Sequence, residues 1–121
     1  MKKIPSLLST VFLLVTFSTG YCTTSLDDAT LARQCFLTSN RLFKLSRLQI
    51  DSACEIMLRI SSKDTEIAGK EIINQQYDEA KLSIKNALLA VKYTELHDCK
   101  YKSEITVLIN DVIEINGHLD E

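Results

Sequence analysis

The sequence predicts an all-α fold, a small helical bundle tied by disulfides. Its 121 residues include only three glycines and one proline, whereas turn-rich β-sandwiches and β-barrels need these residues at their corners. Apolar residues recur at helical spacing over long stretches, most clearly from Glu66 to Leu96. We therefore expect three long helices, with a four-helix up-down-up-down bundle as the alternative.

Residues 1–20 have the features of a cleaved secretory signal peptide. Two lysines precede a charge-free apolar run from Ile4 to Phe17, and Ser18-Thr19-Gly20 supplies small residues before a cleavage site at Tyr21. The run is short for a membrane span, and no other stretch could serve as one in the mature chain. We expect residues 21–121 to form a single domain that is secreted or periplasmic, and an uncleaved N-terminal anchor is the alternative.

The first helix is expected over residues 29–60. A seven-residue apolar step supports one continuous helix and runs through Phe36, Phe43, Ile50 and Met57. Thr38-Ser39-Asn40 is the only weak point, because these side chains compete for backbone hydrogen bonds. A break at Asn40 would give the four-helix alternative.

The second helix is expected from Glu66 to about Leu96, after a turn at Ser61-Ser62-Lys63-Asp64. Its core face spans an arc of roughly 80° and comprises Ile73, Tyr77, Ala80, Ile84, Leu88 and Val91. Leu82, Leu89 and Leu96 form a second stripe on almost the opposite side. These three leucines either pack on the last helix or bind a partner protein or a second copy of the chain.

The last helix is expected after a break at His97-Asp98-Cys99 and ends near Gly117. Its apolar stripe consists of Ile105, Leu108, Ile109, Val112, Ile113 and Leu119. Residues 29–60 carry an excess of lysine and arginine, whereas residues 103–121 carry acids and neither of the two. Either the first and last helices lie side by side and attract, or the first helix offers a basic surface to an acidic partner.

Four cysteines suggest two disulfides in an oxidising compartment, formed by Cys22, Cys35, Cys54 and Cys99. A continuous first helix would hold Cys35 about 28 Å from Cys54, too far for a bond. Both topologies bring Cys35 and Cys99 to the same end, so Cys35–Cys99 is the predicted pair. In the four-helix alternative, Cys22 and Cys54 share the other end.

No constellation in the sequence predicts an enzyme. There are two histidines, no G-x-S-x-G motif and no glycine-rich phosphate loop. His97-Asp98-Cys99 and His118 are the only gathering of ligand-type residues, but Cys99 is expected in a disulfide. We therefore predict no catalytic site, no metal and no cofactor.

The expected function is protein binding. The net charge is −2, and removal of Lys2 and Lys3 with the signal peptide takes it to −4, which disfavours nucleic acid and anionic membranes as partners. We expect an inhibitor, an immunity-type factor or a secreted effector that binds another protein or itself. The alternative is a carrier that holds a ligand, metal or haem within the bundle, using His97 or Met57.

The segment Leu96-His97-Asp98-Cys99-Lys100-Tyr101, followed by a helix, is similar to a segment of the plant invertase and pectin methylesterase inhibitors. The resemblance implies a secreted four-helix protein with two disulfides. The N-terminal half departs from the family, because the closely spaced cysteine pair of that family's first hairpin is missing. No residue role is carried over from it.

Overall fold

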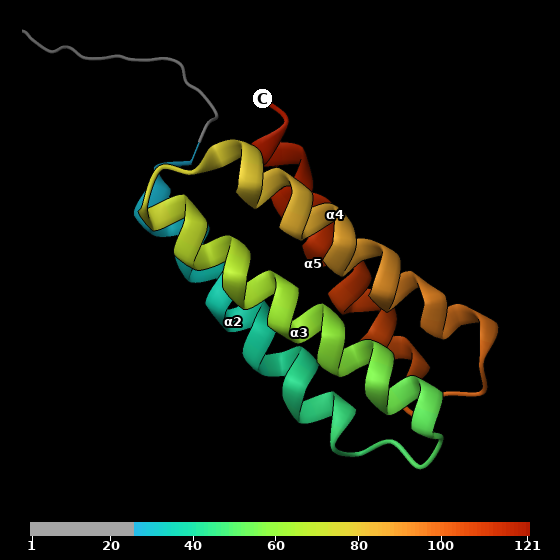
Figure 1. Cartoon of the computed structure of the whole chain (residues 1–121). Coiled ribbons are helices and arrows are strands. Elements are labelled where there is room, and N and C mark those ends of the chain that lie inside the picture. Colours follow the sequence, from blue (N-terminus) through green and yellow to red (C-terminus); the bar gives the residue numbers. More distant parts are fainter. Residues whose placement is uncertain (1–25) are drawn as a thin grey trace, which may run out of the picture.

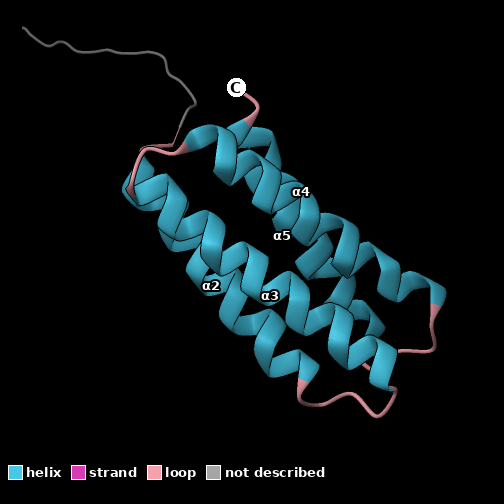
Figure 2. Ribbon diagram, in the orientation of Figure 1, coloured by secondary structure: helices cyan, strands magenta, loops and turns pink. Residues whose placement is uncertain are grey.

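Residues 26–121 are described in this computed structural model, and they fold into four α-helices that pack as a bundle (Figure 1). The elements are α2 (Asp28–Ser46), α3 (Ser52–Ile73), α4 (Tyr77–Tyr93), the 3-10 turn η3 (Thr94–Leu96) and α5 (Lys102–Leu119). Each helix packs against the next along the chain, and α5 also packs against α2. Helices and loops account for all of this part, which holds no strand (Figure 2).

The predicted all-α bundle tied by a disulfide is confirmed, and in the described residues it has the helix number of the four-helix alternative. The signal peptide and Cys22 lie outside these residues. The helix boundaries differ from those expected at three places, and each has a local cause.

The continuous helix expected over residues 29–60 is wrong, and so is Asn40 as the break, because the chain turns between Ser46 and Ser52. Asp51 starts α3 as its N-cap. Its carboxylate accepts hydrogen bonds from the backbone N–H groups of Ala53 at 2.8 Å and Cys54 at 3.1 Å, which otherwise have no partner in a first helical turn.

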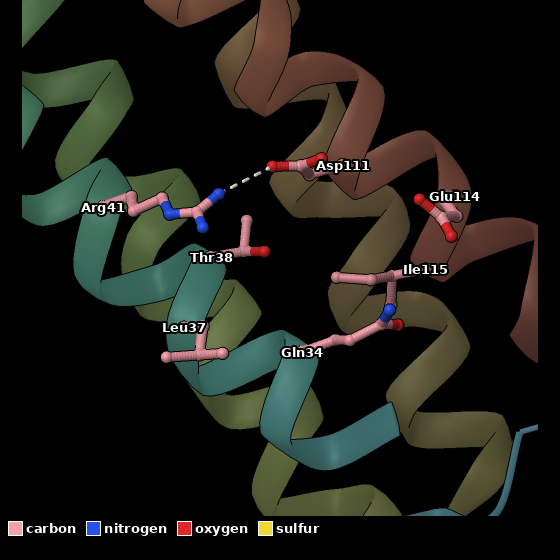
Figure 3. A pocket seen from close by; sticks show the side chains of 7 residues that line it. All are labelled: Gln34, Leu37, Thr38, Arg41, Asp111, Glu114 and Ile115. Atoms are coloured by element: carbon pink, nitrogen blue, oxygen red, sulfur yellow. Dashed lines mark hydrogen bonds and ion pairs between the residues drawn. The ribbon is translucent and has the colours of Figure 1, made fainter. Parts of the chain in front are cut away.

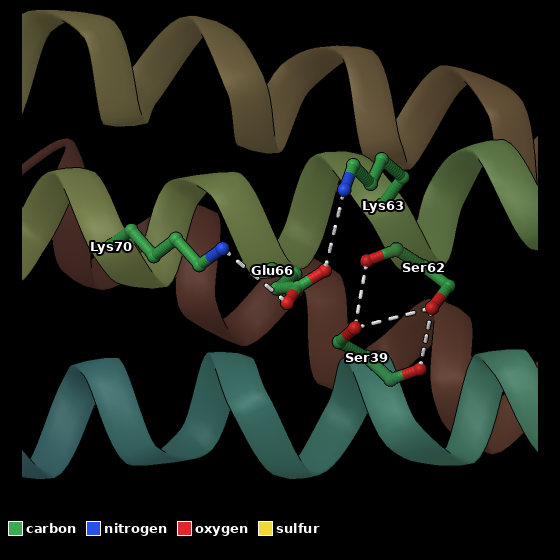
Figure 4. A network of polar contacts seen from close by, with 5 residues as sticks. All are labelled: Ser39, Ser62, Lys63, Glu66 and Lys70. Carbon is green, nitrogen blue, oxygen red and sulfur yellow. Dashed lines mark hydrogen bonds and ion pairs between the residues drawn. The ribbon is translucent and has the colours of Figure 1, made fainter.

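The turn expected at residues 61–64 is also wrong, because these residues lie inside α3. Ser39 Oγ donates to the Ser62 carbonyl at 2.8 Å, and Ser62 Oγ donates to the Ser39 carbonyl at 2.7 Å (Figure 4). Ser61 Oγ donates in the same way to the Ala87 carbonyl at 2.8 Å. The serines therefore serve close helix contacts, to α2 and to α4, rather than a turn.

The stretch expected as one helix from Glu66 to Leu96 is divided at residues 74–76. Gln75 adopts the left-handed conformation, with φ of 61°. The Gln76 N–H donates to the Glu71 carbonyl at 2.8 Å and the Gln75 N–H donates to the Ile72 carbonyl at 3.0 Å, the bond pattern of a Schellman cap. Glycine usually fills such a position, so its absence hid the turn.

The core lies between the four helices. Of the core face predicted for the second helix, three residues are buried and Leu88 is partly buried, whereas Ile73 and Tyr77 are exposed; the buried three are Ala80, Ile84 and Val91. Every apolar residue of the stripe predicted for the last helix is buried except Ile113, and Ile115 is buried in addition. The helical periodicity therefore identified most of the core on the last two helices.

Gly69 of α3 lies against the aromatic ring of Phe36 on α2. A Cβ at position 69 would be 2.6 Å from Phe36 Cε1. We expect Gly69→Ala to lower the free energy of unfolding by up to about 2 kcal/mol, because overpacking costs about 1–3 kcal/mol and the better helix propensity of alanine returns about 1 kcal/mol. Urea unfolding measures this change.

A Phe36→Leu background is the control for this prediction. Without the ring, Gly69→Ala is expected to be neutral or stabilising, so the two changes are coupled. An equal loss of stability in both backgrounds would contradict the contact as the cause.

Candidate functional site

Three leucines form a line on the outer side of α4 and η3. Leu82, Leu89 and Leu96 are 62%, 70% and 75% exposed. The side of α4 that holds Ile84 and Val91 faces the core. The alternative that these leucines pack on the last helix is therefore wrong, and we call Leu82, Leu89 and Leu96 the leucine stripe.

Two further side chains lie between the members of the leucine stripe. Asn86 and Tyr93 are both exposed, and each lies four residues after a stripe leucine. The ring of Tyr93 is tilted on the ring of His97, with 5.2 Å between the centroids. Between Leu82 and Leu96 the exposed line is therefore apolar except for the Asn86 amide, and the exposed Glu79 precedes it in the first turn of α4.

The flanks of the leucine stripe are fixed by contacts to the neighbouring helices. Lys85 Nζ lies 3.3 Å from Asp120 Oδ1 at the C-terminal end of α5. Ser83 Oγ donates to Glu71 Oε1 of α3 at 2.7 Å. Lys85 and Ser83 therefore turn toward α5 and α3 and do not cover the leucines.

A groove between α2 and α5 is the second candidate surface (Figure 3). One hollow of about 220 Å³ is lined by Gln34, Leu37, Thr38, Arg41, Asp111, Glu114 and Ile115. A more apolar hollow of about 320 Å³ is lined by Arg41, Lys44, Leu45, Leu48, Glu104, Val107 and Leu108. The α2–α5 groove was not predicted, because it arises from the pairing of two helices far apart in the sequence.

An ion pair spans the α2–α5 groove between its two hollows. Arg41 Nη1 lies 3.3 Å from Asp111 Oδ2 (Figure 3). The expectation that the basic first helix and the acidic last helix lie side by side is confirmed. Arg41 is largely exposed, so the pair contributes little to stability, and the opposite charges of the two helices were the one sequence signal of this groove.

The disulfide joins Cys54 to Cys99, with 5.7 Å between the Cα atoms, so the predicted pair Cys35–Cys99 is wrong. The chain turns before Ser52, and Cys54 therefore lies at the start of α3, beside the connection from α4 to α5. Gln49 joins the same two loops, because its side chain donates to the Lys100 carbonyl at 3.0 Å and accepts from the Lys100 N–H at 2.8 Å.

Cys35 is a free thiol in the middle of the core and is fully buried. Burial raises the pKa of this thiol to about 12, because the thiolate would lose its hydration. A thiol of this kind is inert as a nucleophile near neutral pH.

The residues considered for a metal or haem are not gathered in one place. His97 precedes α5 and His118 lies in its last turn, so the length of α5 separates them. Cys99 is in the disulfide. Among residues 26–121, no group of three His, Cys, Asp or Glu side chains could hold a metal ion.

Comparisons with other proteins do not indicate a function for this chain. The chain matches no protein-family model, no curated protein and no solved structure. Within the described part, none of the helices has the length and apolar character needed to cross a membrane. The two exposed surfaces therefore carry the functional argument.

Proposed function

We propose that this protein is a non-enzymatic helical protein that acts by binding another protein through the leucine stripe. The observation that carries the proposal is the exposure of all three leucines on one line of α4 and η3. Burial of a leucine side chain contributes about 1.5–3 kcal/mol, so three of them supply a substantial part of a specific interface. The roles that this proposal includes are those of an inhibitor, an immunity-type factor or a secreted effector.

The proposed place of action is outside the cytosol, secreted or periplasmic. The Cys54–Cys99 disulfide supports this part of the proposal, because such bonds persist in oxidising compartments.

Aspartates in the leucine stripe are expected to abolish binding without unfolding the protein. The wild-type protein first captures a partner, which is identified by mass and purified. The double variant Leu82→Asp and Leu89→Asp should then bind this partner at least about 100-fold more weakly, because each aspartate would be buried without a counterion. Calorimetry measures the affinity, and circular dichroism should show an unchanged thermal transition because both sites are exposed.

The matched control places the same substitution in the α2–α5 groove. Leu37→Asp with Val107→Asp alters two side chains that are about half exposed, and it should leave the affinity unchanged. Loss of binding in the control alone would move the binding site to the groove, and unfolding of the stripe variant would place the leucines in the core.

A carrier for a small apolar ligand is the second candidate function. Its supporting observation is the hollow of about 320 Å³ in the α2–α5 groove, where Leu45, Leu48, Val107 and Leu108 face one another. His97 and Met57 do not line it. The groove variant described above also tests this candidate, since Val107→Asp would expel an apolar ligand that copurifies with the wild-type protein.

A further inference from the structure

The exposed side of α4 has the residue spacing of a helix that pairs with another helix along its length. The leucine stripe repeats every seven residues, and Asn86 and Tyr93 each follow a stripe leucine by four. In a coiled coil, the leucines would occupy d positions and the other two would occupy a positions. Charged side chains are absent from these five positions, and the preceding a position, in the first turn of α4, is Glu79.

Asn86 makes this surface complementary to itself. An amide both donates and accepts hydrogen bonds, so two copies of Asn86 that face each other satisfy one another. Opposite a leucine, the same amide would lose its hydrogen bonds on burial. A single asparagine at an a position sets the register of two paired helices, and parallel pairing of two α4 helices places Asn86 opposite Asn86.

From Lys85 onward the two flanks of the leucine stripe differ in charge, whereas Asp78 begins the flank of Lys85 in the first turn of α4. Lys85 and Lys92 share the flank that borders α5, since they are seven residues apart and Lys85 forms an ion pair with that helix. On the other flank, α3 presents Glu71, whose carboxylate accepts the bond from Ser83 of α4. Asp64 lies seven residues before Glu71 and therefore on the same side of α3.

Asp64 is the unpaired member of this acidic flank. No cation of the described residues lies within ion-pair distance of it, and burial raises the pKa of its carboxyl. In a parallel pair, the α5 flank of one copy faces the α3 flank of the other. The lysines beside α5 in one copy therefore approach Asp64 and Glu71 of the other copy. Antiparallel pairing would instead bring Lys85 of one copy against Lys92 of the other, like charge against like.

We propose that the partner of the leucine stripe is a second copy of this chain, docked by parallel pairing of the two α4 helices. The inference rests on the proposed function, because it names the partner of the same surface. The contact is isologous and closes as a two-fold dimer, with each stripe leucine opposite its own copy.

Sedimentation equilibrium of the protein tests the dimer, at concentrations up to about 1 mM so that weak association is detected. The wild-type protein should reach twice the mass of one chain. Asn86→Asp should weaken association by about tenfold or more, because it places two carboxylates face to face in the contact. The matched control Asn110→Asp changes an exposed asparagine of α5 and should leave the association constant unchanged. A monomer throughout this range, or equal effects of the two variants, would overturn the proposal.

A cysteine at position 82 tests the parallel orientation. In a Cys22→Ser and Cys35→Ala background, Leu82→Cys should form an intermolecular disulfide on mild oxidation, because the two copies of residue 82 face each other. An antiparallel pair centred between residues 86 and 89 would separate them by roughly 16 Å along the helices, so a dimer that is not crosslinked overturns the parallel arrangement.

The wild-type protein and the Leu82→Asp, Leu89→Asp variant together distinguish an error in the dimer proposal from an error in the proposed function. A monomeric wild-type protein whose stripe variant still loses a captured partner rejects self-association and leaves the binding function intact. If substitution of the leucines changes neither the mass nor any binding, both proposals fail.

Discussion

Replacement of both Cys54 and Cys99 by alanine is expected to lower the free energy of unfolding by about 4 kcal/mol. The disulfide joins residues 45 positions apart, and in the chain-entropy treatment a loop of this size restricts the unfolded chain by about that amount. For a domain of this size, the loss corresponds to a fall in Tm of about 15–30 °C. Urea unfolding and calorimetry measure the two quantities.

Reduction provides the control for the disulfide. Dithiothreitol should bring the wild-type protein down to the stability of the double variant and should leave the variant itself unchanged. A non-reducing peptide map should link the peptide that contains Cys54 to the one that contains Cys99. A map that joins Cys35 to Cys99, or a variant as stable as the wild-type protein, would contradict the observed pairing.

The second large effect is a loss of stability in alkali that depends on Cys35. Burial raises the pKa of the native thiol to about 12, from a value of 9.0 for an unperturbed thiol. Above pH 9 the unfolded chain therefore releases a proton that the native protein keeps. The contribution of the thiol is fully present below pH 9 and decreases by about 1.4 kcal/mol per pH unit as the pH rises toward 12.

The comparison with Cys35→Ala isolates this effect from the lysines and tyrosines that titrate in the same range. At pH 8 the wild-type protein should be the more stable by about 1 kcal/mol, because alanine leaves a small cavity in the core. By pH 11 the wild-type protein should have lost about 3 kcal/mol relative to the variant, which reverses their order. A difference that stays constant from pH 8 to pH 11 would show that Cys35 is not buried as described.

Helix content and the break after Leu96 were predictable from the sequence, whereas the turns after Ser46 and Ile73 were not. Gln75 adopts a positive φ angle without being glycine, so the connection between α3 and α4 did not carry the usual marker. The seven-residue step that suggested one long first helix was misleading, because Ile50 is 80% exposed in the connection between α2 and α3. The position of such a turn depends on how the helices pack against one another, which the local helix propensity of the sequence does not show.

The leucine stripe was predictable because it depends on a single helix. The angular spacing of Leu82 and Leu89 holds within α4 whatever surrounds that helix, although the spacing alone did not show that they are exposed. The disulfide and the α2–α5 groove depend on which helices meet, and one misplaced turn was enough to choose the wrong partner for Cys99. Side chains that act within one element are therefore the ones best predicted from this sequence.

Among residues 26–121 the disulfide lies at one end of the bundle, so the two ends are expected to differ in mobility. Cys54, Cys99 and the Gln49–Lys100 hydrogen bonds hold one end together, whereas the start of α2, the turn at Gln75 and the end of α5 meet at the other end. Thermal fraying should therefore begin at the open end and spread toward the crosslink. The leucine stripe runs from the open end toward the disulfide. A partner is therefore expected to contact a more mobile surface at Leu82 and a more rigid one at Leu96.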